Sequence, residues 1–530
     1  SIVSFAIEKD IFGYKASVFH FFNVLFFSLT CVLLYHLLRR LLHNQNEWLP
    51  FTAAILFAIH PIHTEVVANI KSRDEIYALM FSMAAFIMLL QKDNWRIFIA
   101  AVLFFLGLLS KENAVTFLLL IPLGLFFFSD DKLKSILTKT APLFIVTCIY
   151  LLMRAKFAGM VGDRVTTDIM DDNYLHATMM QKLATITQIQ LHYLLLLVWP
   201  VTLSYDYSYN QLPLVNWGNL QAILSLVLHL CFVIVAIMSY KKNKLITYSV
   251  VFYLATFSIV SNLVFNIGTS MAERFAFMPS VSIAIILAYG LARILKVDLN
   301  SKLKFTTVPL VLIAFVILMA AYITIPRNKD WKDNYTLYKA DVYKVPNSAR
   351  SRLYYGIENI SQYTHGNNDV ALLNEAVKHI KIACGINPDF HYAFHNLGVA
   401  YQTMNMWKES IACYNRVLQL MPDNEQAFYG LGLAYGKGLN QPDRAIPYFK
   451  RLVNDMHKTM PDYYESLGLC YAIKQDYQQA LSYFRTGIEK NPDAGKLYYN
   501  AAITFMNMGL KDSGDFYFNK ATLIDPSLKR

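Results

Sequence analysis

Residues 306–326, TTVPLVLIAFVILMAAYITIP, are followed directly by residues 327–346, RNKDWKDNYTLYKADVYKVP. The first stretch is apolar over about the 20 residues that a helix needs to cross a bilayer, whereas the second is charged and rich in tyrosine. From about residue 17 up to this junction the chain is a series of apolar runs separated by short charged loops, and after it the chain is polar. We therefore expect an all-α protein with a polytopic membrane helix bundle over residues 1–326, a connector over 327–346 and a water-exposed domain over 347–530.

The composition agrees with a membrane protein. Hydrophobic residues make up 55% of the 530 residues, and the formal net charge is +11. Much of this positive charge lies in short loops between apolar runs, where it sets topology, so we expect no nucleic-acid partner. The six cysteines are scattered and predict no disulfide framework. The chain begins with Ser1 and no signal peptide precedes the first apolar run, so we interpret the bundle as N-terminally incomplete.

Ten apolar runs are candidate membrane spans, although several are shorter than a straight span requires. They cover residues 17–42, 48–62, 75–91, 95–110, 113–128, 138–155, 219–239, 245–264, 277–295 and 306–326. A further run, 184–199, could either span the membrane or lie as an interfacial or re-entrant helix. The non-spanning alternative is favoured, because a span there would place the basic run 241–244 on the wrong side of the membrane.

Basic clusters in the short loops predict the orientation. They consist of Arg39 and Arg40; Lys92 and Arg96; Lys132, Lys134 and Lys139; Lys241, Lys242 and Lys244; and Arg293, Lys296, Lys302 and Lys304. If 184–199 does not span, all of them fall on one side, which the positive-inside rule makes cytoplasmic. The opposite, extracytoplasmic face then carries residues 1–16, 60–74, 110–112, about 156–218 and 265–276, together with the whole C-terminal domain.

The C-terminal part repeats itself about every 34 residues, the period of the tetratricopeptide repeat. One small-residue position recurs as Gly356, Gly398, Gly432, Gly468 and Ala502, and an aromatic follows three residues later as Tyr401, Tyr435, Tyr471 and Phe505. Prolines end successive units at Pro388, Pro422, Pro461, Pro492 and Pro526. We expect about five repeats over 347–530, with insertions near 365–369 and 437–441, forming an α-solenoid whose groove binds an acceptor or partner protein.

Polar residues gather in the loops of the predicted outer face. His60, His63 and Glu65 follow one span, and Lys71, Arg73, Asp74 and Glu75 precede the next. Two histidines three residues apart could hold a metal, but Pro61 interrupts the helix and no second ligand cluster is evident, so we expect no metal site. A hydrogen-bonded structural turn and the polar wall of an active site are the remaining alternatives.

Three further outer loops carry candidate residues. Lys111 and Glu112 lie in a turn between two apolar runs, where a cation beside a low-dielectric region could bind a lipid phosphate. Asp206 lies in a loop rich in tyrosine and hydroxyl groups. Glu273 and Arg274 precede the span that starts at residue 277; the arginine could bridge two phosphate oxygens, or the two residues could form an interfacial ion pair.

Several of these segments resemble one family. HPIHTE (60–65) with SRDE (72–75), the SKEN turn (110–113), WPVTLSYDYS (199–208), NIGTSMAERFAFMPS (266–280) and RNKDWKDNYTLY (327–338) are similar to segments of the transmembrane and tetratricopeptide-repeat (TMTC) family. The resemblance implies a GT-C-fold membrane glycosyltransferase related to protein O-mannosyltransferases. Such an enzyme would take mannose from a polyprenyl- or dolichyl-phosphate carrier and transfer it to Ser or Thr of a protein on the extracytoplasmic side.

The resemblance leaves the catalytic base unassigned. The family carries an acidic motif in an outer loop, and residues 1–16 resemble only the end of that loop, so the base would precede Ser1. For the donor phosphate we expect Arg274 and Lys111, then Arg73. We expect the sugar or acceptor pocket to involve His60, His63, Glu65, Asp74, Glu112, Asp206 and Glu273. No cofactor is required beyond the lipid-linked sugar, because a lipid phosphate is a good leaving group.

Two other functions compete with this interpretation. The chain could be a membrane-anchored repeat scaffold without catalytic activity. It could also be a transporter, although its polar residues gather at one face rather than at the middle of the spans, where transporters place their binding sites.

Overall fold

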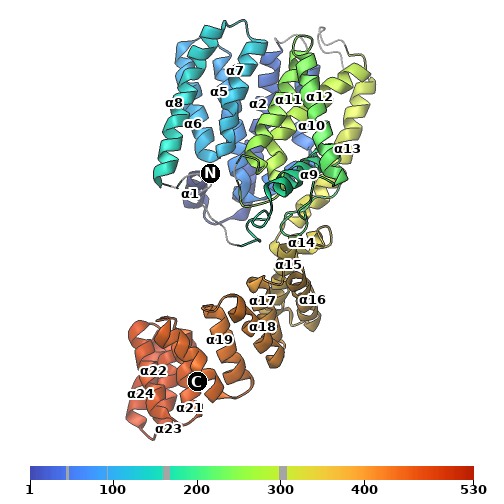
Figure 1. The fold of residues 1–530 in the computed structure, drawn as a ribbon. Helices are drawn as coiled ribbons and strands as arrows, with labels where there is room; N and C mark the ends of the chain where they lie inside the picture. The colour runs from blue at the N-terminus through green and yellow to red at the C-terminus, as the bar shows by residue number, and fades with distance from the viewer. Residues whose placement is uncertain are drawn as a thin grey trace. The chain divides into compact units, whose positions relative to one another are not determined.

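The computed structural model describes residues 1–42, 47–91, 93–157, 159, 168–264, 266–297 and 307–529, without the side chains of 307–310 and 367. Within these ranges the regular structure is helical throughout, which confirms the predicted all-α class (Figure 1). The chain divides into two compact units, Ser1–Ser348 and Ala349–Arg530. The predicted connector 327–346 therefore lies within unit 1. Lys92, Lys302 and Lys304 of the predicted cytoplasmic clusters lie outside the described residues.

Unit 1 is a bundle of helices joined by loops, some of which contain short 3-10 turns. The longer helices are α1 (Ile2–Phe12), α2 (Ala16–Leu41), α3 (Trp48–Ile59), α5 (Arg73–Leu89), α6 (Asn94–Ser110), α7 (Phe117–Phe128), α8 (Leu133–Phe157), α9 (Met179–Val198), α10 (Leu220–Ser239), α11 (Lys244–Val260), α12 (Phe277–Ile294), α13 (Thr307–Asp330) and α14 (Asn334–Asp341). The short elements are η1 (Pro61–His63), α4 (Thr64–Ala68), η2 (Ile70–Ser72), η3 (Glu112–Thr116) and η4 (Glu273–Ala276).

Unit 1 contains enough long apolar helices for a multi-pass membrane protein. Among the described residues, five helices have the length and composition to cross a membrane, and a sixth results if α3 and the bent segment after it count as one span. Helix α6, η3 with α7, and α11 are shorter and apolar. Residues 184–198 of this run lie in the helix α9, which does not meet these length and composition criteria, and Trp199 caps its C-terminal end. Whether α9 spans the membrane stays a prediction.

Large side chains fill the core of the bundle. Trp48, Phe57, Phe86, Phe104 and Phe277 are buried and come from four different helices, α3, α5, α6 and α12. Glycine allows α7 to approach this core, because a Cβ atom on Gly124 would lie 2.3 Å from the Phe86 ring. Close packing of this kind holds the helices in register, and it thereby fixes which loops meet at each end of the bundle.

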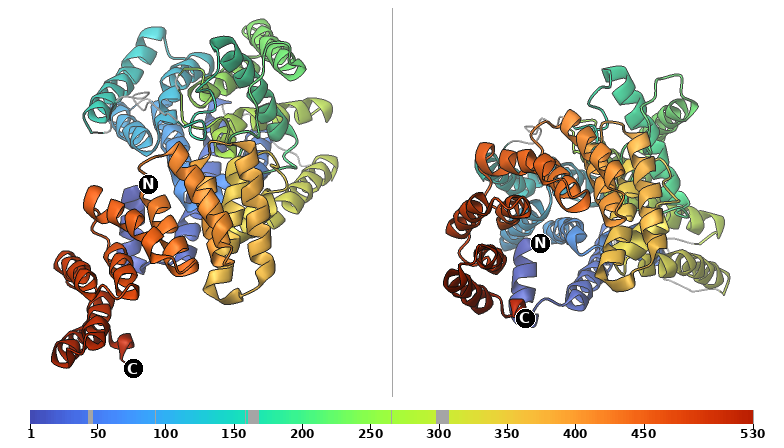
Figure 2. Two further views of the ribbon diagram at one scale, coloured as in Figure 1. Left: turned by 60° about the horizontal axis from the view of Figure 1, so that its bottom comes forward. Right: turned by 90° about the horizontal axis from the view of Figure 1, so that it is seen from below.

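Unit 2 consists of five helix pairs stacked in chain order (Figures 1 and 2). The pairs are α15 (Ala349–Gln362) with α16 (Val370–Ile386), α17 (His391–Thr403) with α18 (Trp407–Leu420), α19 (Glu425–Leu433) with α20 (Pro442–Lys450), α21 (Pro461–Ile473) with α22 (Tyr477–Lys490), and α23 (Gly495–Asn507) with α24 (Lys511–Ile524). Both predicted insertions appear as π-helical turns, Tyr363–Asn367 and Ala434–Gly438. The repeated small residues face the second helix of their own pair: a Cβ on Gly468 would lie 2.4 Å from the Phe484 ring.

This close approach predicts a strong response to one added methyl group. Gly468→Ala should destabilise unit 2 by about 1–3 kcal/mol, because the α21 and α22 helices would have to separate. Gly385→Ala in α16 is the matched control, since no atom lies within 4 Å of its Cβ position. That change should be neutral or stabilise by up to about 1 kcal/mol through helix propensity. Hydrogen exchange of the α21 and α22 amides in the detergent-solubilised chain measures both effects, and equal protection in both variants would contradict the packing argument.

Candidate active site

The turn after α3 is built by its own hydrogen bonds. Helix α3 ends at His60 because Pro61 has no N–H to continue it. The Ile62 N–H donates to His60 Nδ1 at 3.2 Å, so His60 Nε2 carries the proton and donates to the Leu197 carbonyl at 2.9 Å. His63 Nε2 lies 2.8 Å from Ser280 Oγ in α12. These contacts favour the structural-turn alternative for the two histidines.

Glu65 joins this turn to the segment that begins α12. Its carboxylate accepts the Arg274 backbone N–H at 2.8 Å and the Arg274 guanidinium at 2.5 Å. The sequence suggested the neighbouring Glu273 as the ion-pair partner of Arg274, but the structure pairs Arg274 with Glu65 instead. Glu65 is buried, whereas the Arg274 side chain is 31% exposed and packs over the Phe275 ring. One side of the guanidinium is therefore held while the group still reaches the surface.

Lys111 lies on the same aromatic ring and has its own carboxylates. Its Nζ is 2.7 Å from Glu75 Oε1, 3.3 Å from Asp74 Oδ2 and 5.9 Å from the centre of the Phe275 ring. Asn113 Nδ2 donates to the other Glu75 oxygen at 3.1 Å. Burial alone would lower the pKa of Lys111, but the Glu75 and Asp74 carboxylates outweigh burial and raise that pKa. Lys111 therefore stays charged at neutral pH.

These residues form one site, which we call the cation-pair site: Glu65, Asp74, Glu75, Lys111 and Arg274. Three segments far apart in sequence supply them: the α3–α5 connection with the first turn of α5, the α6–α7 connection and the α11–α12 connection. Both cations approach Phe275, and each is oriented by at least one carboxylate. Asp74 and Arg274 are the members with the most exposed side chains, at 28% and 31%. They are therefore the groups that a ligand would meet first.

Arg73 is placed differently from the other two candidate cations. It is fully buried, and its guanidinium donates to Asn23 Oδ1 at 2.6 Å, to the Phe19 carbonyl at 2.8 Å and to the Glu8 carboxylate. Each guanidinium nitrogen already has a partner, so these contacts favour a structural role that anchors α1 to α2 and α5. We therefore retain Arg274 and Lys111 as candidate phosphate-binding residues. Glu112 also lies outside the cation-pair site and pairs with Arg154 at 3.2 Å.

Asp206 and Glu273 organise the loop that precedes α10. Asp206 accepts hydrogen bonds from the hydroxyls of Ser208 and Ser348 at 2.8 and 2.5 Å. Glu273 accepts from the Ser204 N–H at 2.6 Å and from the Tyr207 hydroxyl at 2.7 Å. Burial, and then the adjacent Glu273 carboxylate, raise the pKa of Tyr207 well above its ordinary value, so Tyr207 remains the proton donor in this bond.

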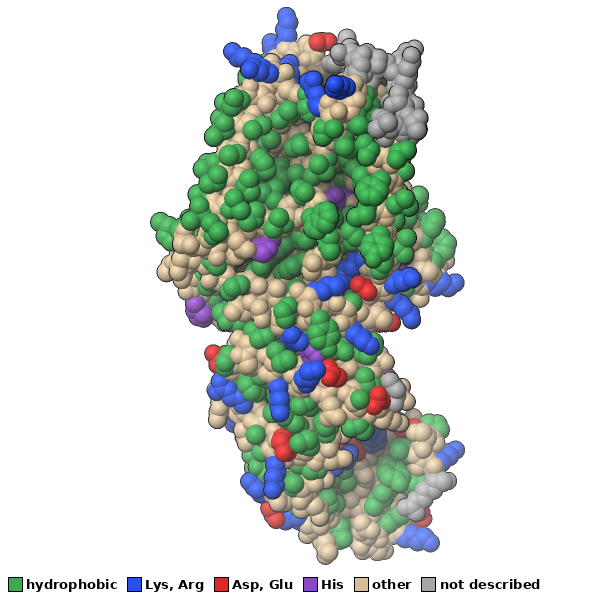
Figure 3. Space-filling view, turned by 90° about the vertical axis from the view of Figure 1, so that its right-hand side faces the viewer, with side chains coloured by type: hydrophobic (Ala, Val, Ile, Leu, Met, Phe, Trp, Pro, Cys, Tyr) green, Lys and Arg blue, Asp and Glu red, His purple; other side chains and the backbone are tan. Residues whose placement is uncertain are grey.

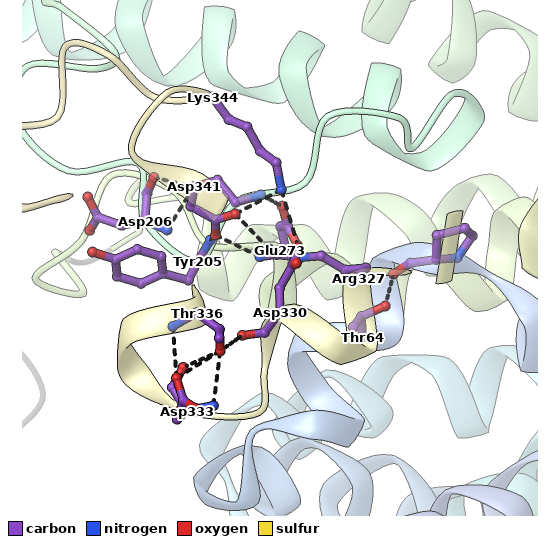
Figure 4. Close-up of polar contacts among 12 residues, drawn as sticks. Thr64, Tyr205, Asp206, Glu273, Arg327, Asp330, Asp333, Thr336, Asp341 and Lys344 are labelled. Carbon is purple, nitrogen blue, oxygen red and sulfur yellow. Dashed lines mark hydrogen bonds and ion pairs between the residues drawn. The ribbon is translucent and has the colours of Figure 1, made fainter. Parts of the chain in front are cut away.

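Arg327 and Asp341, which the sequence analysis did not single out as site residues, lock the same loop to the end of α13 (Figure 4). Asp341 accepts two hydrogen bonds from Arg327, at 2.6 and 2.8 Å, and one from the Tyr205 N–H at 2.8 Å. Lys344 adds a third cationic contact to Asp341 at 2.9 Å. Both residues lie in the segment 327–346. The many charged residues of this segment, directly after a predicted span, are the sequence feature that could have indicated them.

The comparisons with known proteins bear on the region that holds this site. Residues 5–158 match the family described as dolichyl-phosphate-mannose-protein mannosyltransferase, and residues 404–438, 426–455, 461–493 and 495–528 match tetratricopeptide repeat families. The chain therefore joins a region similar to this mannosyltransferase family to a region similar to tetratricopeptide repeats. Of the cation-pair site, Glu65, Asp74, Glu75 and Lys111 lie inside the matched mannosyltransferase region, and Arg274 lies beyond it.

Curated relatives share both parts. The chain is 24% identical over 458 residues to human protein O-mannosyl-transferase TMTC3. This aligned region covers 80% of this chain and 48% of that protein. The chain is 27% identical over 382 residues to O-mannosyl-transferase F38B6.6 of Caenorhabditis elegans (70% and 51%) and 25% identical over 445 residues to human TMTC1 (75% and 48%). The predicted resemblance to the TMTC family is thereby confirmed. The chain spans about half the length of these relatives.

The Arg327–Asp341 contact predicts a large loss of stability when one partner is removed. Asp341→Ala should cost about 3–5 kcal/mol, because it leaves the buried Arg327 guanidinium without its main counter-ion. Lys344→Ala is the control: it removes a half-exposed contact to the same carboxylate and should change stability by less than about 1 kcal/mol. Thermal unfolding of the purified chain in detergent measures the stability of both variants. Equal losses of stability in the two variants would contradict the role of Asp341 as the main counter-ion of Arg327.

Proposed function

We propose that the mannosyltransferase domain of this chain transfers mannose from a polyprenyl- or dolichyl-phosphate carrier to Ser or Thr hydroxyl groups of a protein. The observation that supports this proposal most directly is the convergence of Lys111 and Arg274 over Phe275 (Lys111 with Asp74 and Glu75, Arg274 with Glu65). The matched family description and the names of the relatives support the same activity. In this proposal the enzyme has the GT-C type of fold.

The proposed reaction is a displacement at the anomeric carbon. The acceptor hydroxyl oxygen forms a bond to that carbon, the bond from the carbon to the phosphate oxygen breaks, and the phosphate leaves with the electron pair. A carboxylate takes the hydroxyl proton, and a cation stabilises the charge that develops on the phosphate. Arg274 suits this second role, because Glu65 orients one side of its guanidinium while the side chain remains partly exposed. We assign the base to none of the residues of this chain.

The cation-pair site also has groups that suit a sugar. Three carboxylates already surround the two cations. An anionic ligand would therefore be attracted to this site less strongly than to two cations without carboxylate partners. Carboxylate oxygens accept hydrogen bonds from sugar hydroxyls, and Phe275 offers an aromatic face. We propose that the exposed Asp74 carboxylate contacts the sugar and that Arg274 contacts the phosphate.

The function is tested by transfer from polyprenyl-phosphate mannose to a membrane-fraction acceptor. Glu65→Gln with Arg274→Gln in one chain removes the guanidinium without leaving a buried carboxylate unpaired. We expect transfer to fall by about 10²–10³-fold, as is typical when a group that stabilises developing negative charge is removed.

Lys378→Ala in unit 2, which removes an exposed cation, is the matched control and should transfer at the rate of the unchanged chain. Equal transfer by the double variant and the control would remove Arg274 from the mechanism. Absence of transfer by the unchanged full-length protein, with either carrier, would favour the non-catalytic scaffold.

We further propose that the repeats lie on the extracytoplasmic side and bind the acceptor or a partner protein. The basic clusters of the short loops support this orientation, as does the position of the cation-pair residues in the loops between those clusters. In a chain with Cys148 and Cys231 replaced by Ser, Lys378→Cys should react with a membrane-impermeant maleimide from the extracytoplasmic side. Lys241→Cys should react only after permeabilisation. The reversed pattern would disprove the orientation.

A further inference from the structure

A cavity of about 300 Å³ lies in unit 1 between the end of α3, the turn that follows it and helix α13. Phe27, Ile59, Ile317 and Ala321 line its apolar part, and His63, Thr324 and Asn328 are among its polar lining residues. Ile317 and Ala321 belong to the apolar part of α13, which has the length and composition of a membrane span. Figure 3 views the molecule from the side of α13 and shows apolar side chains over most of the middle of unit 1 on this face. The cavity is therefore positioned to take a hydrocarbon chain from the bilayer.

Two polar groups of the lining have unused hydrogen-bonding capacity. Thr324 Oγ1 and His63 Nδ1 are shielded from solvent, and neither has a partner with hydrogen-bond geometry among the described residues. A threonine hydroxyl inside a helix commonly donates to the carbonyl four residues earlier, but Thr324 does not. Buried polar groups nearly always have hydrogen-bond partners. Two unpaired polar atoms beside one cavity therefore indicate that a molecule bound in the cavity supplies their partners.

The hydrogen-bond network defines what His63 requires. The Ser280 hydroxyl lies 2.6 Å from the Phe277 carbonyl oxygen and 2.8 Å from His63 Nε2; from this network we assign its proton to the carbonyl, so that Ser280 Oγ accepts from His63 Nε2–H. The proton of the neutral ring is thus on Nε2, and Nδ1 is an acceptor that needs a donor. Thr324 can donate its own hydroxyl proton. A hydroxyl group satisfies both, because it donates one hydrogen bond and accepts others.

A phosphate does not fit this lining. A fully ionised phosphate ester has no proton to donate to His63 Nδ1. In addition, no Lys or Arg of the described chain lines the cavity, so a buried phosphate would have no counter-ion. The cation-pair site lies on the other side of the same turn, because Thr64 lines the cavity while Glu65 binds Arg274.

We propose that this cavity is a second lipid site, separate from the donor site, that binds the hydrocarbon chain of a membrane lipid with an uncharged hydroxyl head. The head donates to His63 Nδ1 and accepts from Thr324, and the chain lies along Phe27, Ile59, Ile317 and Ala321. The site does not depend on the proposed transferase activity, since it uses none of the residues of the cation-pair site.

The test uses the purified full chain in lipid nanodiscs and two photoactivatable probes with the same C16 chain, one a primary alcohol and the other its phosphate monoester. Cross-linked peptides are identified by mass spectrometry. We expect the alcohol to label peptides of α3–α4 and α13 at least about tenfold more than the phosphate does. Equal or stronger labelling by the phosphate at these peptides would overturn the proposal.

Two variants and a control localise the label. Ala321→Phe fills the cavity, and His63→Phe keeps an aromatic ring against Phe57 and Phe277 but removes the acceptor. Each should reduce alcohol labelling at α3–α4 and α13 by about tenfold. Val235→Phe, at an exposed apolar position of α10, should leave it unchanged. Labelling that persists in both cavity variants, or that falls equally in the control, would disprove the site.

A sugar hydroxyl could meet the same two polar groups, and competition separates the two sources. Methyl mannoside at millimolar concentration should not reduce alcohol labelling if the occupant is a lipid. Loss of labelling with the mannoside would assign the polar end of the cavity to a sugar and overturn the lipid proposal. Transfer assays run on the same variants keep this outcome distinct from that of the proposed function.

Discussion

The contact between Glu65 and Arg274 holds together the end of unit 1 where the candidate site lies. A carboxylate buried beside an apolar bundle is stable only with a partner, and Glu65 has two, the backbone N–H and the guanidinium of the same residue. The contact fixes the turn after α3 to the segment that begins α12. The preceding residue, Glu273, faces the other way and accepts from the loop before α10. The adjacent residues Glu273 and Arg274 therefore have different roles: Arg274 places its guanidinium at the site, and Glu273 holds the loop before α10 beside it.

Burial separates the cations of this end of unit 1 into two kinds. Arg73 and Arg327 are enclosed, and each guanidinium group binds a buried carboxylate, so these contacts favour a structural role for both residues. Arg274 and Lys111 are held on one side only and meet over Phe275. The residue type is the same in three of the four cases. The difference in role follows from how much of each group the protein leaves uncovered.

The turn between α3 and α5 separates two environments of opposite chemistry. On one side lie the charged groups of the cation-pair site, which suit a sugar and a phosphate. On the other side lies the cavity against α13, with apolar walls and the buried polar atoms His63 Nδ1 and Thr324 Oγ1. Thr64 and Glu65 are adjacent in sequence and face these two environments. A short segment that begins with Pro61 can do this because its helical geometry is broken there and restarted.

The sequence alone determined the features that depend on local pattern: the apolar runs, the period of the repeats with their small and aromatic positions, and the gathering of polar clusters in the loops of one face. These follow from side-chain spacing along a helix, which neighbouring residues set. Only the tertiary structure decided that Arg274 pairs with Glu65 rather than Glu273, that Arg73 is enclosed, that Asp341 holds Arg327, and that Thr324 faces a cavity. Each of these depends on which helix ends meet, and contacts between residues far apart in the chain are fixed by the packing of the whole bundle.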